Sequence, residues 1–168
     1  ITGDALDDNK KPYARRSNMR DTAIIALLGG TGIRVSELVG IDLNDIDWEH
    51  NCIRIIRKGG NEDIVYFGDE LHRYLEDYIN YEREPGDDKE KALFVASRKD
   101  KGRLTVRSVE RIVSKYGTAT IPSKHLSPHS LRRTFGTNYY EETSDLYAVA
   151  DALGHKNIQV TKDHYADI

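Results

Sequence analysis

Two arginines, two histidines and one late tyrosine stand along this chain in an order that could carry out chemistry on a phosphodiester. Arginine suits the binding of such a group because its planar fork grips two phosphate oxygens and keeps its charge. A tyrosine hydroxyl can act as the nucleophile. The candidate residues are Arg34, His129, Arg132, His155 and Tyr165. Together they predict an attack on a DNA phosphodiester that needs no metal ion.

His129 and Arg132 fall at the start of a predicted helix. Ser127 and Pro128 are a strong start signal, because serine caps a helix well and proline is favoured at its first position. His129 then lies in the first turn, and Arg132 lies on the same face three residues later. The free N–H groups and the dipole of a helix N-terminus favour an anion, so a phosphate fits there. On these residues alone, a capped surface helix with an incidental His and Arg explains the pattern equally well.

Arg34 follows the glycine-rich run 29–32 and precedes Glu37 by three residues, a spacing at which the carboxylate can hold the guanidinium. The plainer explanation is a surface ion pair, which contributes little to stability. The glycine run does not match a nucleotide-binding loop. It lacks a following Gly-Lys-Ser/Thr, it does not fit G-x-G-x-x-G, and the segment before it is predicted to be helical.

The sequence indicates neither a metal site nor a disulfide. His125 and His129 are four residues apart, but Pro128 places them on opposite sides of a helix start. No glutamate lies between them, as the zinc-protease pattern requires. The single cysteine, Cys52, excludes an internal disulfide and a cysteine-based metal cluster. We therefore expect no metal in the site.

The total charge argues against a nucleic-acid-binding protein, whereas the charge distribution argues for one. The 168 residues carry a net charge of −3 and a pI near 6.1. Between Arg98 and Arg133, however, ten Lys and Arg residues stand against two acids. In the predicted helix 105–116, one face is apolar, and Arg107, Arg111 and Lys115 lie four residues apart on another. This basic face could follow a DNA backbone, and the alternative is an ordinary solvated surface.

The length predicts one domain, residues 1–168, which is enough to bury roughly 70% of the unfolded surface. The chain lacks an apolar run long enough for a membrane span and a signal-peptide pattern, so we expect a cytoplasmic protein without membrane contact. It begins at Ile1 without a methionine, which we interpret as a fragment of a longer protein.

The predicted elements are mostly helical. Helices are expected over 20–28, 34–39, 69–84, 105–116, from Ser127 onward, over 146–153, and over a last segment that Asn157 caps and that carries Tyr165. Strands are expected over 52–57 and 63–67, joined by a glycine-containing turn with Lys58 at its tip, and over 93–96. The glycine run 29–32 is expected to break the first helix, Gly40 to end the second, and Gly154 to end 146–153. The fold class is therefore mainly α with a small antiparallel β-sheet.

Three stretches carry a resemblance to one family. They are Gly30-Thr31-Gly32-Ile33-Arg34-Val35-Ser36-Glu37-Leu38, Pro128-His129-Ser130-Leu131-Arg132-Arg133-Thr134-Phe135-Gly136-Thr137, and Leu153-Gly154-His155-Lys156-Asn157-Ile158 running on to Tyr165. Between the first two, Arg57-Lys58-Gly59-Gly60-Asn61-Glu62 looks like a hairpin that carries a functional lysine. Over nearly its whole length the chain resembles the catalytic domain of the tyrosine recombinases, the phage-integrase family, and this resemblance implies their catalytic-domain fold.

The resemblance implies a mechanism in which Tyr165 attacks the scissile phosphate and forms a 3′-phosphotyrosyl bond, releasing a 5′-hydroxyl. It implies that Arg34 and Arg132 hold the non-bridging oxygens and that Lys58 protonates the departing 5′-oxygen. Glu37 would orient Arg34. Because the bond energy is kept in the phosphotyrosine, no cofactor, neither ATP nor a metal, is expected.

The two histidines have implied roles as well. His129 would take or share the tyrosine proton, and His155 would hydrogen-bond the phosphate. Two positions depart from the common family pattern. Arg133 stands where the family often has histidine, and Tyr165 comes ten residues after His155, whereas the commoner spacing falls on His164. We assign Tyr165 as the nucleophile because imidazole does not have that role in the family.

The resemblance implies a site-specific DNA recombinase, an integrase or transposase of a mobile element or phage, that acts on double-stranded DNA as a homotetramer. Accessory DNA-bending factors are further candidate partners. The N-terminal core-binding domain of the family is missing from these residues, so we expect the fragment to bind DNA poorly by itself. Two alternatives remain open: a type IB topoisomerase-like activity that relaxes supercoils, and a non-catalytic DNA-binding module of the same fold.

Overall fold

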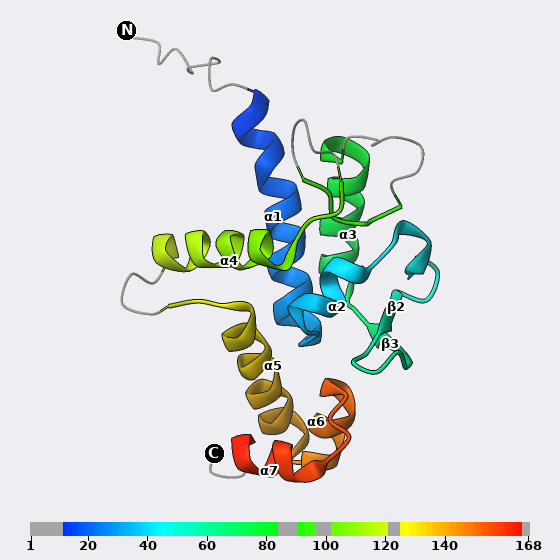
Figure 1. Cartoon of the computed structure of the whole chain (residues 1–168), viewed down its shortest axis with the longest axis vertical. Helices are drawn as coiled ribbons and strands as arrows, with labels where there is room; N and C mark the ends of the chain where they lie inside the picture. Colours follow the sequence, from blue (N-terminus) through cyan, green and yellow to red (C-terminus); the bar gives the residue numbers. More distant parts are fainter. Residues whose placement is uncertain (1–11, 84–90, 97–101, 121–124, 166–168) are drawn as a thin grey trace, which may run out of the picture.

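The computed structural model describes residues 12–83, 91–96, 102–120 and 125–165 (Figure 1). It confirms a mainly helical fold with a small antiparallel sheet. The elements are α1 (Pro12–Thr31), α2 (Val35–Gly40), the 3-10 turn η1 (Leu43–Asp45), β1 (Ile46–Asp47), β2 (Cys52–Ile56), β3 (Glu62–Tyr66), α3 (Asp69–Asp77), the π-helical turn η2 (Tyr78–Glu82), α4 (Val106–Thr120), α5 (Pro128–Thr143), α6 (Leu146–Leu153) and α7 (Ile158–Tyr165).

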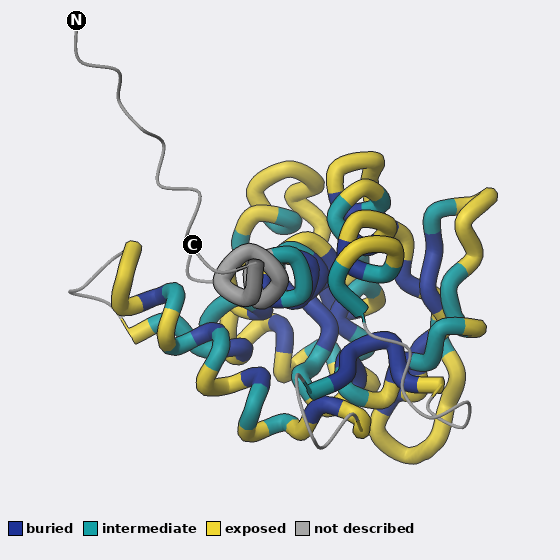
Figure 2. Tube along the Cα trace, turned by 90° about the horizontal axis from the view of Figure 1, so that it is seen from above, coloured by how far each residue is buried: buried dark blue, intermediate teal, exposed yellow. Residues whose placement is uncertain are grey.

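Helix α1 forms the centre of the main core. Its residues Ala23, Ile24, Leu27 and Leu28 have no solvent-exposed surface, and the helix contacts α3, α4 and α5. Figure 2 shows the buried residues gathered inside this group of helices. The burial of these apolar side chains is the main force that holds the helices together.

The sequence predicted that the glycine run would break the first helix at Gly29. Helix α1 instead continues through Gly29 and Gly30 to Thr31. Each glycine costs a helix about 1 kcal/mol relative to alanine. Packing against three helices outweighs this cost, and the Thr31 hydroxyl donates a hydrogen bond of 2.6 Å to the carbonyl of Leu27. The helix ends at Gly32, whose φ of 65° lies in the left-handed region. Arg34 follows two residues later.

The predicted hairpin is present. Strands β2 and β3 pair antiparallel with Cys52 opposite Tyr66 and Ile56 opposite Glu62, and β1 adds a third strand beside β2. The predicted strand ends, Arg57 and Phe67, lie just outside the strands. The inner face of the sheet belongs to the same core as α1. This packing fixes the hairpin beside α2.

Two sequence predictions need correction between β3 and α4. The predicted helix 69–84 begins at Asp69 but changes to a π-helical turn at Tyr78, and Glu84 lies outside the described residues. The predicted strand 93–96 is wrong, since the bridge that this segment makes, Val95 with Arg103, is isolated, as is the bridge of the preceding Ala92 with Asp42. Leu93 and its neighbours are buried in the core, and their apolar character reflects that burial.

The C-terminal helices form a second, smaller packing unit below the main core in Figure 1. Helices α6 and α7 pack against each other and against α5, around the buried residues Val149, Leu153 and Tyr165. As predicted, α6 ends at Gly154. The Asn157 side chain accepts a hydrogen bond of 2.9 Å from the main-chain N–H of Gln159 at the start of α7. Among the described residues, no helix has the length and apolarity needed to cross a membrane.

The basic helix is confirmed as α4, although it extends to Thr120. Val109 and Val113 are fully buried, while Arg107, Arg111 and Lys115 are exposed. The helix crosses α1 in Figure 1. The predicted division into an apolar and a cationic face is therefore present.

Candidate active site

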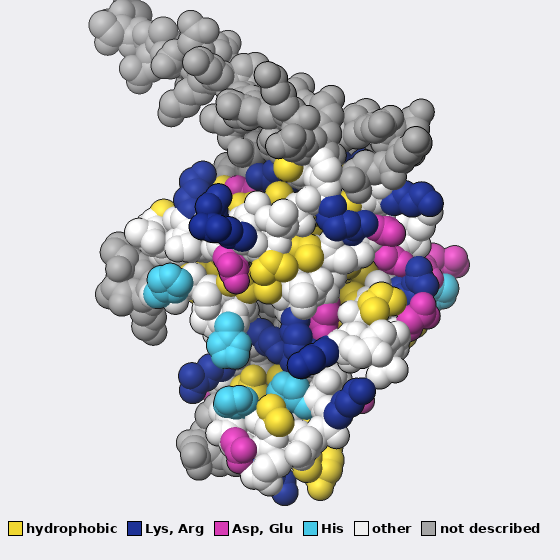
Figure 3. All heavy atoms as spheres, viewed as in Figure 1, with side chains coloured by type: hydrophobic (Ala, Val, Ile, Leu, Met, Phe, Trp, Pro, Cys, Tyr) yellow, Lys and Arg dark blue, Asp and Glu magenta, His cyan; other side chains and the backbone are white. Residues whose placement is uncertain are grey.

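The structure gathers most of the sequence-predicted site residues around one pocket of about 420 Å³. The pocket lies between the start of α2, the start of α5, and the region where α6 is followed by α7. Figure 3 shows basic side chains and histidines gathered in the hollow in the middle of one face. The predicted site residues that line the pocket are Arg34, His129, Arg132, Arg133, His155 and Tyr165, together with His164.

Arg34 lies at the N-terminus of α2 and is held by Glu37. Its Nη1 lies 2.9 Å from Glu37 Oε1, and its main-chain N–H donates to Glu37 Oε2 over 2.7 Å. The Glu37 side chain is only 2% exposed, so this is not the surface ion pair that the sequence left as an alternative. A second arginine, Arg57, also donates to Glu37 Oε2, over 3.2 Å. One buried carboxylate therefore orients two guanidinium groups.

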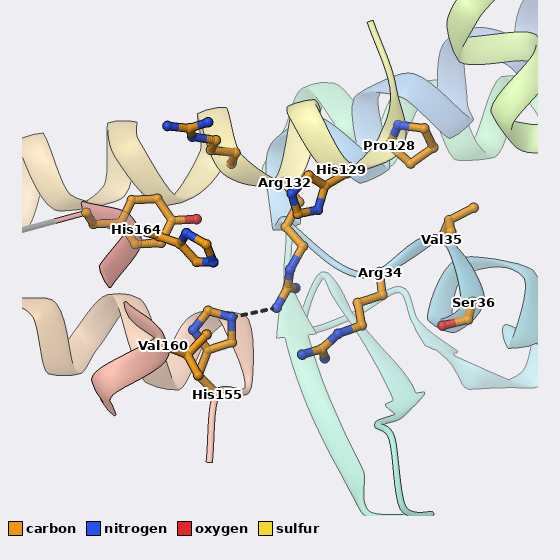
Figure 4. Close-up of a pocket in the computed structure, with 11 residues that line it drawn as sticks. Arg34, Val35, Ser36, Pro128, His129, Arg132, His155, Val160 and His164 are labelled. Carbon is orange, nitrogen blue, oxygen red and sulfur yellow. Dashed lines mark hydrogen bonds between the residues drawn. The ribbon is translucent and has the colours of Figure 1, made fainter. Parts of the chain in front are cut away.

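Arg132 is buried at the floor of the pocket and anchored by main-chain carbonyls. Its Nη1 donates to Gly32 O over 2.5 Å, and its Nη2 donates to Leu153 O over 2.7 Å. Burial lowers the pKa of Arg132 to about 10, and the positive charge of Arg34 contributes to the shift. The side chain remains protonated at neutral pH. Figure 4 shows the Arg34 and Arg132 guanidinium groups pointing into the same space.

The pocket therefore concentrates positive charge. Two guanidinium groups of its lining, those of Arg34 and Arg132, lie near a single buried carboxylate, Glu37. That carboxylate also pairs with Arg57, which does not line the pocket and pairs with Asp63 as well. An anion that entered the pocket would relieve the repulsion between the arginines. A phosphate suits the arrangement, because guanidinium groups bind phosphate oxygens through paired hydrogen bonds.

His155 is held between two partners. Its Nε2 lies 3.2 Å from Arg132 Nη2, and its Nδ1 lies 2.8 Å from the hydroxyl of Thr161, a fully buried residue. Arginine can only donate, so Nε2 must accept, and Nδ1 carries the hydrogen that it donates to Thr161. The pKa of His155 is lowered to about 4. Burial is the largest cause, and the positive charges of Arg132 and Arg34 contribute to the same shift. His155 is therefore neutral at physiological pH.

Tyr165 borders the pocket and also belongs to the second hydrophobic cluster. Tyr165 is 3% exposed, and its ring lies against Gly136 of α5, where an added Cβ would overlap the hydroxyl oxygen. Burial raises the pKa of Tyr165, while Arg132 and Arg133 pull it in the opposite direction. The His164 ring stands edge-on to the Tyr165 ring, with centroids 6.2 Å apart. The hydroxyl is therefore neutral at pH 7 and needs a base if it is to attack.

Helix α5 presents His129 to the pocket through the predicted cap. The Ser127 hydroxyl accepts from the Ser130 N–H over 3.1 Å, and the Ser130 hydroxyl accepts from the Ser127 N–H over 2.8 Å. This reciprocal capping box, with Pro128 in the first turn, satisfies two N–H groups of the helix start. His129 is exposed, and Figure 4 shows it above the Arg132 guanidinium.

Of the predicted catalytic residues, Lys58 is the one that the structure does not bring to this pocket. It lies exposed in the turn between β2 and β3, and it is absent from the residues that line the pocket. Gly59 and Gly60 follow it with φ values of 92° and 84°, so the turn depends on their freedom from side chains. The side chain of Lys58 would have to extend toward a bound molecule to take part in chemistry.

The three basic residues of α4 line a second hollow, of about 690 Å³. Arg107, Arg111 and Lys115 share it with Glu110 and with His129, which also lines the first pocket. The two hollows therefore meet at His129. A long anionic ligand could occupy both hollows, and Arg107, Arg111 and Lys115 would then lie along the ligand.

No group of three or more His, Cys, Asp or Glu side chains among the described residues could hold a metal ion. Two residues of the site were missed at the sequence level, Arg57 and Thr161. No sequence pattern marks either residue, although each contacts a predicted site residue, Glu37 for Arg57 and His155 for Thr161. The partners of Arg57 include main-chain carbonyls more than ninety residues away, and Thr161 of α7 contacts His155 in the loop before that helix.

The sequence profile described as the phage integrase family matches residues 5–168, nearly the whole chain. The chain belongs to the phage integrase family. Among curated relatives of this integrase-family chain, the tyrosine recombinase XerC of Corynebacterium glutamicum is 42% identical over 144 residues. The XerC of Vibrio cholerae is 36% identical over 145 residues. Each alignment covers 86% of this chain but 46% of the relative, so the chain spans about half the length of the curated relatives it matches.

Solved structures of the family agree with the fold. The crystal structure of XerA recombinase superposes with a TM-score of 0.80 at 29% identity, covering 90% of this chain and 55% of that chain. The structure of XerH site-specific recombinase bound to difH substrate gives a TM-score of 0.77 at 25% identity, covering 89% of this chain and 43% of that chain. The integrase-family chain therefore has the fold of a tyrosine recombinase catalytic domain.

Proposed function

We propose that this chain is the catalytic domain of a site-specific recombinase that cuts and rejoins DNA through a 3′-phosphotyrosyl intermediate. The observation that carries the proposal is the convergence of Arg34, Arg132, His155 and Tyr165 on one pocket, although they come from distant parts of the sequence. The names of the relatives, which are tyrosine recombinases at 36–42% identity, support the same reaction class.

In the proposed reaction, the scissile phosphate lies between the two pocket arginines. Arg34 and Arg132 hold its non-bridging oxygens and stabilise the charge that grows in the transition state. Glu37 and the carbonyls of Gly32 and Leu153 keep both guanidinium groups in place before the substrate arrives. Such preorganisation matters because the enzyme then spends no energy on reorienting its charges during the reaction.

The bond from Tyr165 Oη to phosphorus forms as the bond from phosphorus to the 5′-oxygen breaks. The tyrosine proton passes to His129, and Lys58 supplies a proton to the departing 5′-oxygen. The raised pKa of Tyr165 makes the base necessary. His155 donates from Nε2 to a phosphate oxygen once its hydrogen has moved from Nδ1, and Thr161 then becomes the donor to Nδ1.

Double-stranded DNA is the proposed partner, with its backbone along Arg107, Arg111 and Lys115 of α4. The hollow that these residues line meets the pocket at His129, which supports a continuous path for one strand. We further propose that the chain is one catalytic domain of a longer cytoplasmic recombinase. In this proposal an N-terminal core-binding domain completes the grip on DNA, and four copies assemble on it, with or without accessory bending factors. An integrase or transposase of a mobile element fits this description.

Strand exchange is favoured over the two alternatives. The relatives described above are named as recombinases rather than topoisomerases, which supports exchange between two duplexes over relaxation of one. A non-catalytic module would have no need of a buried carboxylate, Glu37, that orients two arginines beside a tyrosine. Joining of two marked duplexes, rather than relaxation of a supercoiled plasmid, is the outcome that we expect.

The test is covalent trapping with the complete recombinase that contains this chain. The probe is a library of nicked duplexes with randomised base pairs around the nick, so that no target site has to be known. Cleavage beside the nick releases a short 5′-hydroxyl fragment, and the protein stays attached to the DNA through an SDS-stable bond. We expect wild-type protein to form the adduct and Tyr165→Phe to form none.

Peptide mass mapping of the adduct identifies the modified residue. His164→Ala is the matched control, because His164 lines the same pocket and takes the position of the commoner spacing. It should leave the tyrosine adduct in place. An adduct on His164, or an adduct that persists in Tyr165→Phe, would refute the assignment of the nucleophile. Absence of any adduct with the wild type would refute the proposed function itself.

A further inference from the structure

Arg57 is a buried arginine at the base of the hairpin turn, and its side chain is 8% exposed. Every nitrogen of its guanidinium group has a partner. Nε donates to Asp63 Oδ2 over 2.9 Å, and Nη1 donates to Glu37 Oε2 over 3.2 Å. Nη1 also lies 3.3 Å from Leu153 O, and Nη2 lies 3.1 Å from Ala152 O. Arg57 thus joins the hairpin to α2 and to the end of α6.

Arg57 shares an acceptor with each of the two pocket arginines. Glu37, which accepts from Arg57 through Oε2, orients Arg34 through Oε1. The Leu153 carbonyl, which accepts from Arg57, also accepts from Arg132 over 2.7 Å. A displacement of the Arg57 guanidinium would therefore disturb the supports of both phosphate-binding candidates.

The space for the Arg57 guanidinium is shaped by Gly154. An added Cβ at Gly154 would come within 2.7 Å of Arg57 Nε and 2.8 Å of its Cζ. The glycine also has a φ of 65°, as the residue that ends α6 in the left-handed conformation. The end of α6 and the arginine therefore pack against each other directly.

Arg57 also defines the turn that carries Lys58. Its N–H donates to Asn61 O over 2.7 Å, and its carbonyl accepts from the Gly60 N–H over 3.0 Å. Lys58 is the next residue and is exposed. Because the turn is closed by these two bonds on Arg57, anchoring the Arg57 side chain fixes the main chain from which Lys58 extends.

We propose that Arg57 is a positioning residue that sets the hairpin turn, and with it Lys58, relative to Arg34 and Arg132. This inference rests on the proposed function. If Arg57 only stabilised the hairpin, its ion pair with Asp63 on the adjacent strand would be sufficient. Three of the four hydrogen bonds instead leave the hairpin, toward α2 and α6.

Arg54 provides a matched contrast, because it lies on β2 three residues before Arg57. Its side chain is 52% exposed and pairs with Asp45 and Glu62, without contact to α6. Replacement of Arg54 removes an arginine and two ion pairs from the same hairpin. It leaves the link from the hairpin to the pocket intact.

The experiment measures the single-turnover rate of adduct formation in the complete recombinase. Arg57→Met and Arg57→Lys are compared with Arg54→Met, and Lys58→Ala is the reference for a lost general acid. The probe is one nicked duplex selected from the randomised library, made with either oxygen or sulfur at the bridging 5′ position. A thiol has a pKa of about 8.5, so the sulfur leaves without needing a proton.

On the oxygen duplex we expect Arg57→Met to slow adduct formation by about 100-fold, the scale of a lost general acid. Arg57→Lys should also be slow, because lysine keeps the charge but loses the planar fork. Arg54→Met should change the rate by less than about fivefold. On the sulfur duplex, the defect of Arg57→Met, measured as the ratio of the wild-type rate to the variant rate, should be at least about tenfold smaller than on the oxygen duplex. The defect of Lys58→Ala should shrink in the same way.

Two results would overturn the inference. One is an Arg57→Met rate on oxygen equal to that of Arg54→Met. The other is a defect of equal size on oxygen and sulfur, which would mean that Arg57 acts without Lys58. If circular dichroism shows that Arg57→Met does not fold, Arg57→Lys decides the comparison. If the wild type forms no adduct on either duplex, the proposed function is refuted rather than the role of Arg57, so the two failures are distinguishable.

Discussion

Replacement of Thr161 by valine should slow catalysis without removing any group that touches the DNA. Thr161 is fully buried, and its hydroxyl lies 2.8 Å from His155 Nδ1. Valine has nearly the same shape but no hydroxyl. The imidazole nitrogen would then be left without a partner, whichever tautomer His155 adopts.

The size of the effect follows from that lost partner. A buried polar group without a hydrogen bond costs about 1–3 kcal/mol. If about 2 kcal/mol of this cost falls on the transition state, where His155 must donate from Nε2 and accept at Nδ1, the rate falls about 30-fold. Thr161→Ser keeps the hydroxyl and should remain within about fivefold of the wild type, since only a methyl group is lost.

The assay is the single-turnover rate of covalent adduct formation on saturating nicked duplex, at a temperature well below the unfolding midpoint of each variant. The measurement then reports the reaction rather than loss of folded protein. Thr161→Val as fast as the wild type would refute the reasoning, because His155 would not need its second hydrogen bond. Thr161→Ser as slow as Thr161→Val would refute it as well, because the hydroxyl would not be the group that matters.

Two further outcomes concern stability. The pKa of His155 is about 4 in the folded protein against 6.5 ordinarily, so its contribution to the free energy of unfolding should be lost as pH drops from about 6.5 to about 4, and this residue should add no further loss below that. Urea unfolding of His155→Asn against pH should lack this part of the loss, and equal pH slopes in both proteins would contradict the assignment. Gly136→Ala should destabilise the protein by about 1–3 kcal/mol through its clash with Tyr165, whereas Gly30→Ala, which has open space, should be neutral or stabilising by up to about 1 kcal/mol. Thermal unfolding measures both, and equal effects of the two alanines would exclude the clash as the cause.

Local signals in the sequence predicted the start of α5 and the end of α6. Ser127 and Pro128 form the expected helix start, and Gly154 ends α6, because caps depend on residues within one turn. The apolar and cationic faces of α4 followed from helical spacing for the same reason. Glycine propensity, by contrast, gave a wrong end for α1 at Gly29, since the packing that holds the helix comes from residues far along the chain.

The candidate site was predicted in its residues and in one support, the Glu37 carboxylate beside Arg34, but not in its other supports. Arg34, Arg132 and Tyr165 meet around one pocket, as their family order implied. The roles of Arg57 and Thr161 could not be predicted, because their contacts are set by tertiary packing and partly by main-chain atoms that look alike in every sequence. Lys58 remains outside the pocket. Its predicted role therefore depends on where the hairpin turn holds it relative to the pocket.

The shared carbonyl of Leu153 has a consequence for mutational scanning. It accepts from both Arg57 and Arg132, yet it belongs to the peptide backbone. An alanine scan leaves that oxygen untouched and would report position 153 as a packing site alone. Only a change to the chain itself, such as an ester in place of the peptide bond after Leu153, would weaken both contacts together. The junction of the two arginines therefore depends on where the backbone places this carbonyl rather than on a side-chain group at position 153.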